Sequence, residues 1–173
     1  MSKRMRDAHA QTRNLPEQFR RLSFQEKGAR MVRQRFVARS LADDLAGTRA
    51  GLIQLLDLLK TPQEAIIVVP DLGTLKLSIL SDVMGEPVAK QLLKDRKVTF
   101  TDGSTMYLCS KATLNNFKHA QAYLCLWNDA ATIAAIEAFD LWRSMIVVTW
   151  NPSDSLRWEQ AHAVTVLYQS KTN

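Results

Sequence analysis

A chain of 173 residues with 46% hydrophobic and 23% charged residues has the composition of one globular domain, which excludes a wholly disordered protein. Its longest apolar runs are shorter than the roughly 20 residues that a membrane helix requires. The net charge of +6 is uneven, because residues 1–40 hold 11 Lys/Arg against 3 Asp/Glu and residues 41–173 hold 12 against 14. The sequence therefore predicts a near-neutral body that follows a basic N-terminal arm.

The N-terminal part reads as helical. Leu15-Pro16-Glu17 resembles a helix start, and apolar residues spaced by four and five positions predict a helix over Phe24–Leu45. Glycines at 47 and 51 interrupt this pattern before a second helix over 52–60. We therefore assign residues 1–62 to a basic helical arm and its helices.

The pattern changes at residue 65. Short apolar runs predict three buried strands, and Asp102-Gly103 between two alternating runs predicts a hairpin. Residues 164–168 fit either a helix extension or an edge strand. The predicted fold is α/β, a three-layer mixed sheet with helices on both faces, over residues 63–173. The predicted strands are 65–69, 97–101, 104–109, 122–127 and 145–150. The predicted helices are 72–93 with a break at 85–87, 114–119, 130–142 and 155–163.

Polar residues follow three of the predicted strands. Asp71, Asp129 and Asp154 would share one rim of a parallel sheet, where carboxylates hold Mg²⁺ or act as acid and base. The competing interpretation is that they cap the helices that follow. Asn151 and Arg157 belong to the same predicted crevice, and Trp150 or Trp158 is a candidate stacking wall beside it.

The common catalytic and cofactor motifs are absent from the sequence. It contains no Gly-x-x-x-x-Gly-Lys-Ser/Thr, no Gly-x-Gly-x-x-Gly and no Gly-x-Ser-x-Gly. Three scattered histidines give no metal-ligand spacing, and Cys109 and Cys125 lie in apolar strands, which favours buried free thiols. We therefore predict no cofactor, no metal and no catalytic residue.

Four segments carry a resemblance to a known family. The segments are an apolar strand ending in Pro70, residues 98–104, Trp127–Ala130 and Val148–Pro152. Their order along the chain resembles the middle of a phage terminase or helicase-type ATPase core. That family has a strand ending in Asp-Glu, where this chain has Asn128-Asp129. The family's Walker A loop is missing, so the resemblance does not imply ATP hydrolysis.

The basic arm carries the strongest functional signal, because lysines and arginines that neutralise phosphates release counterions and drive nucleic-acid binding. We predict a non-enzymatic nucleic-acid-associated protein of the cytoplasm that does not bind membranes. The alternatives are an assembly factor that binds an acidic protein partner, or a small enzyme acting on a nucleotide or phosphorylated metabolite at the strand-end rim. The protein could form an oligomer in any of these roles. The residues predicted to contact phosphates are Lys3, Arg4, Arg6, Arg13, Arg20, Arg21, Lys27, Arg30, Arg33, Arg35 and Arg39.

Overall fold

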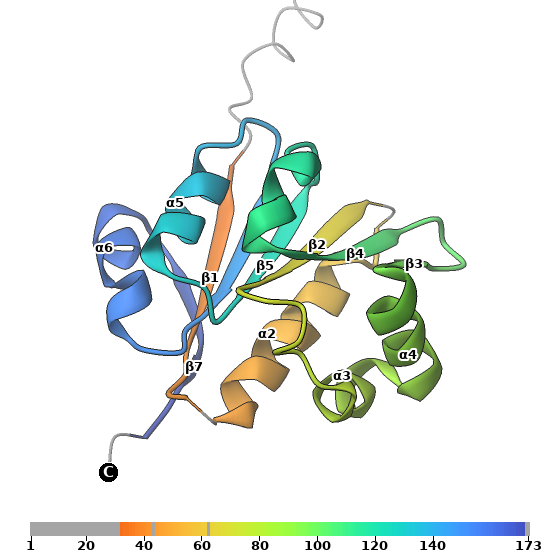
Figure 1. The fold of residues 1–173 in the computed structure, drawn as a ribbon. Coiled ribbons are helices and arrows are strands. Elements are labelled where there is room, and N and C mark those ends of the chain that lie inside the picture. Colours follow the sequence, from red (N-terminus) through yellow and green to blue (C-terminus); the bar gives the residue numbers. More distant parts are fainter. Residues whose placement is uncertain (1–31, 43, 62, 172–173) are drawn as a thin grey trace, which may run out of the picture. The chain divides into compact units, whose positions relative to one another are not determined.

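A computed structural model describes residues 32–42, 44–61 and 63–171 (Figure 1). Its compact α/β unit begins at Arg33. Among the described residues, no helix has the length and apolar character needed to cross a membrane. The predictions made for residues 1–31 lie outside the described part.

The unit is built on a mixed sheet of seven strands in the order β3-β4-β2-β5-β6-β1-β7 (Figure 1). Only β3 runs antiparallel, in the hairpin with β4 that Asp102-Gly103 predicted. All other neighbouring strands are parallel. The strands are β1 (Gln34–Arg39), β2 (Glu64–Val69), β3 (Lys97–Thr99), β4 (Thr105–Ser110), β5 (Ala122–Leu126), β6 (Ser144–Val148) and β7 (Thr165–Gln169).

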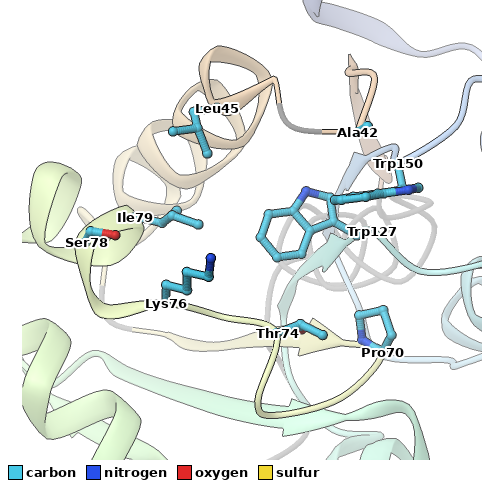
Figure 2. Close-up of a pocket in the computed structure, with 9 residues that line it drawn as sticks. All are labelled: Ala42, Leu45, Pro70, Thr74, Lys76, Ser78, Ile79, Trp127 and Trp150. Carbon is cyan, nitrogen blue, oxygen red and sulfur yellow. The ribbon is translucent and has the colours of Figure 1, made fainter.

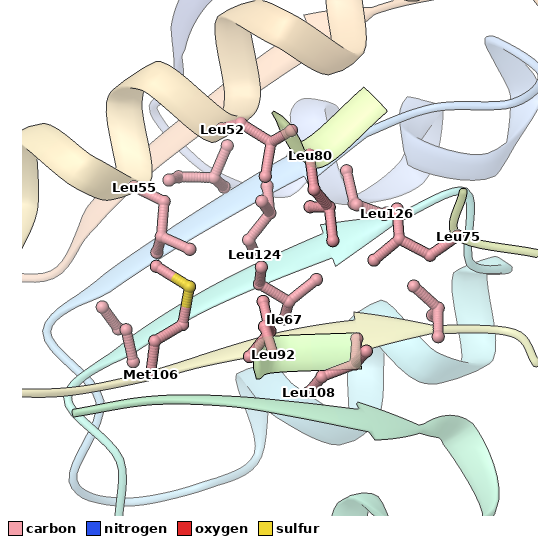
Figure 3. Packing of buried hydrophobic residues seen from close by; sticks show 14 of the residues in the cluster. Leu52, Leu55, Ile67, Leu75, Leu80, Leu92, Met106, Leu108, Leu124 and Leu126 are labelled. Atoms are coloured by element: carbon pink, nitrogen blue, oxygen red, sulfur yellow. The ribbon is translucent and has the colours of Figure 1, made fainter. Parts of the chain in front are cut away.

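Helices cover both faces of the sheet, as the sequence predicted. On one face lie α2 (Leu45–Leu58), α3 (Leu77–Met84) and α4 (Glu86–Asp95), which pack Leu52, Leu80 and Leu92 onto the strands (Figure 3). On the other face lie the short 3₁₀ helix η2 (Lys111–Phe117), α5 (Ala130–Glu137) and α6 (Ser153–Ala161). The result is a three-layer α/β/α body.

The central strands are buried on both faces because they carry continuous apolar runs rather than alternating ones. In β2, Ile67 and Val69 face α2 to α4, whereas Ile66 and Val68 face η2, α5 and α6. This two-sided burial explains why the runs in β2, β5 and β6 were recognisable from the sequence.

The helix predicted over Phe24–Leu45 is wrong over Gln34–Arg39, which form strand β1 between β6 and β7. The predicted interruption at residues 47–51 is also wrong, because Gly47 and Gly51 lie inside α2. A Cβ at Gly51 would lie 2.4 Å from Val148 Cγ2, so the glycine lets the helix approach the sheet closely. The structure thus places β1 and α2 within the α/β unit, and residues 165–169 form the edge strand β7.

Candidate functional site

The carboxyl ends of the parallel strands lie at one edge of the sheet, where ligands bind in folds of this class. The loops that follow β1 and β2 lead to α2 and α3 on one face. The loops that follow β5 and β6 lead to α5 and α6 on the other face. Because β2 pairs with β5, and β6 pairs with β1, these divergent loops leave a crevice between them.

A cavity of about 610 Å³ occupies this crevice (Figure 2). Its size is within the range of small-molecule sites in proteins. Its walls come from the ends of β1, β2, β5 and β6 and from the start of α2 and α3. The lining residues are Ala42, Leu45, Pro70, Thr74, Lys76, Ser78, Ile79, Trp127 and Trp150.

Two tryptophans form a corner of this cavity. The ring centroids of Trp127 and Trp150 are 6.0 Å apart and their planes meet at 78°. Trp127 has a left-handed backbone (φ +55°), which is rare for a residue with a large side chain. Its indole Nε1 donates a 3.2 Å hydrogen bond to Thr48 Oγ1 of α2, which fixes the ring.

The carboxylates of the predicted rim accept hydrogen bonds from nearby backbone amides, and of the three only Asp129 caps a helix. Asp71 Oδ1 accepts a hydrogen bond from the Gly73 amide, and Asp154 Oδ2 accepts one from the Asn151 amide. Asp129 caps α5 by accepting from the amide and hydroxyl of Thr132. The hydrogen bond from Lys111, and to a lesser degree those from Thr132, lower the pKa of Asp129 to about 2.

These carboxylates are not gathered in one site. Asp154 and Arg157 line a different cavity, between α5 and α6, and neither Asp71 nor Asp129 lines the crevice with the tryptophans. Over the described ranges no three His, Cys, Asp or Glu side chains are grouped as metal ligands. Cys109 and Cys125 are buried free thiols, and burial raises the pKa of Cys109 to about 12.

Three arginines of the predicted phosphate-contact set lie in the described part, and their guanidinium groups are engaged by the body. Arg35 forms an ion pair with Glu137, and Arg39 Nη2 lies 2.6 Å from Glu159 Oε2. Arg33 donates to the carbonyl oxygen of Phe139 at 2.8 Å and stacks on the Trp142 ring. The other eight residues of the set lie outside the described part.

Of the two tryptophans proposed from the sequence as a stacking wall, Trp150 lies in the crevice. Trp158 is instead buried against α5 and donates from Nε1 to Glu137 at 2.9 Å. Sequence reasoning missed Lys76 and Trp127. Lys76 was part of a predicted helix over 72–93, and the left-handed backbone that orients Trp127 leaves no mark in the sequence.

Comparison with known proteins finds no relative of this chain. No protein-family model, no curated protein and no solved structure matches the chain. The resemblance to terminase and helicase-type ATPase cores has no support from these comparisons, and the site has to be interpreted from its own chemistry.

Proposed function

We propose that the protein associates with nucleic acid without catalysing a reaction, and that its basic N-terminal arm contacts the phosphates. The observation that carries the proposal is the charge of residues 1–31, which contain eight Lys/Arg and three Asp/Glu. Arg33, Arg35 and Arg39 already have partners in the body. The phosphate contacts are therefore assigned to the eight residues that precede them.

This charge predicts a definite salt dependence. Each phosphate neutralised on a single strand contributes about −0.7 to the slope of log K against log salt. Eight basic residues thus set a limit of about −6 for the contribution of the arm. Fluorescence anisotropy measures this slope. The full-length protein is titrated into a labelled 20-nucleotide single strand at several salt concentrations.

The matched variants place equal charge changes on the arm and on the body. Replacing Arg4, Arg6, Arg13 and Arg20 with Gln is expected to weaken binding and to make the slope shallower by up to about 3. The control replaces four exposed body lysines with Gln, which gives the same net charge and is expected to change both quantities less. These lysines are Lys94, Lys97, Lys118 and Lys171.

Two results would refute the proposal. One is a binding constant that does not respond to salt, and the other is a control variant that loses as much binding as the arm variant. A wild-type protein that retains an acidic protein after nuclease treatment but binds no nucleic acid would favour the assembly-factor alternative instead.

A further inference from the structure

The crevice at the carboxyl edge of the sheet has the features of a site for a flat ring. Trp127 and Trp150 meet at 78°, so a ring that stacks on one indole has its edge against the other. Leu45, Ile79 and Pro70 complete the apolar part of the wall (Figure 2). Aromatic side chains stack on nucleobases in this way, with little dependence on sequence, because every base has a π face.

Both tryptophans are anchored before any ligand arrives, Trp127 through its backbone and its indole and Trp150 through its backbone. The backbone amide of Trp127 donates to the Val148 carbonyl at 2.9 Å, and its indole is bonded to Thr48. The carbonyl of Trp150 accepts a 2.9 Å hydrogen bond from the amide of Ala42, while its side chain remains 46% exposed. A preformed surface binds at lower cost, because fewer side chains are immobilised on binding.

Lys76 gives the crevice a positive charge. Its amine points into the cavity between Ile79 and Trp127 (Figure 2). Within the described residues it forms no ion pair, and none of the nine residues that line the cavity is acidic. An ammonium group beside two aromatic faces suits a ligand that combines a planar ring with an anion.

We infer that this crevice binds one nucleotide unit, with the base in the corner of Trp127 and Trp150 and the phosphate on Lys76. A base must be unpaired and unstacked to enter, so the site selects single strands over duplexes. The unit comes from a strand or is a free mononucleotide. Binding of a unit within a strand rests on the nucleic-acid association proposed above, whereas binding of a free mononucleotide does not.

The test measures two ligands on the full-length protein. Anisotropy follows a labelled 20-nucleotide single strand and the matching duplex, and tryptophan fluorescence follows adenosine 5′-monophosphate. The variants are Trp150→Ala, Trp150→Phe and Lys76→Gln. Lys94→Gln is the control for charge and Leu156→Ala is the control for an exposed apolar side chain. Thermal unfolding checks that each variant is folded.

The inference predicts separate effects for stacking and for charge. Trp150→Ala should weaken single-strand binding at least about five-fold and leave the salt slope unchanged, since it removes one base stack. Trp150→Phe should retain most of the binding. Lys76→Gln should weaken binding and make the slope shallower by about 0.7, as expected for one phosphate contact. The two control variants should bind like the wild type, and Trp150→Ala should leave duplex binding unchanged, because a paired base cannot enter the crevice.

The outcomes separate this inference from the proposed function. If the single strand binds with a steep salt slope but Trp150→Ala and Lys76→Gln have no effect on either ligand, the crevice inference is overturned and the function of the arm survives. If only the mononucleotide binds, and both variants abolish its binding, the crevice inference stands and the association with nucleic acid fails. If neither ligand binds, both are overturned.

Discussion

Replacement of Glu137 by Gln is expected to destabilise the protein more than any exposed charge substitution. Glu137 ends α5, and its carboxylate accepts hydrogen bonds from Arg35 of β1 and from Trp158 of α6. Its side chain is 18% exposed and that of Arg35 is 15% exposed. One carboxylate therefore connects a strand and two helices in a poorly solvated position, with His162 3.9 Å away.

The expected loss is about 2–4 kcal/mol of unfolding free energy. Removing one member of a fully buried ion pair costs about 3–5 kcal/mol, because the remaining charge stays desolvated. The residual exposure of Glu137 and Arg35 reduces this, since water reaches part of the guanidinium group. A glutamine still accepts one hydrogen bond from Trp158, so the main loss is the charge opposite Arg35.

Urea unfolding at pH 7 measures the effect, with Glu86→Gln as the matched control. Glu86 begins α4 and pairs with Lys90 one turn away, and both side chains are 62% exposed, so only a small loss is expected there. The double variant Arg35→Gln with Glu137→Gln should cost less than the two single variants together. Equal losses in Glu137→Gln and Glu86→Gln, or strict additivity with Arg35→Gln, would refute the reasoning.

Three further predictions concern the packing of the sheet and its acid stability. Gly51→Ala should cost about 1–3 kcal/mol in urea unfolding, because its Cβ would overlap Val148 Cγ2; equal or greater stability would contradict this. Thr149→Val should cost about 1–3 kcal/mol of unfolding free energy, measured by thermal unfolding. The buried Thr149 hydroxyl donates to the Ser40 carbonyl at 2.8 Å and accepts from the Ser40 amide, and valine can do neither. A variant as stable as the wild type would exclude that contribution. The pKa of Asp129 lies below its usual 3.8, at about 2, so the stability it contributes is present above pH 3.8 and is lost as pH falls toward 2. Asp129→Asn should flatten the acid unfolding profile over that interval, and an unchanged profile would exclude this role.

The elements that sequence reasoning found share one property, which is burial on both faces. The strands β2, β5 and β6 are continuous apolar runs flanked by turn residues, and such runs fit a parallel sheet better than a surface helix. The hairpin was found because Asp-Gly is a local turn signal. These features depend on neighbouring residues in the chain alone.

Strand β1 was missed because its arginines are satisfied by residues far away in the sequence. Arg35 and Arg39 flank the apolar run 36–38, and their partners Glu137 and Glu159 lie more than 100 positions later. A local pattern with many arginines reads as a solvated helix face when those partners are unknown. The same limit applies to the crevice, since Lys76, Trp127 and Trp150 meet only after the sheet has formed.

The position of β1 also determines when the sheet can assemble during synthesis of the chain. In the sheet, β1 lies between β6 and β7, so Phe36 pairs with Ile146 on one side and with Thr165 on the other. At synthesis rates of about 5–20 residues per second, β1 leaves the ribosome on the order of 5–20 seconds before either partner exists. The strand that follows the basic arm therefore gains its neighbours late, and the carboxyl edge that carries the crevice is completed only after Trp150 has been made.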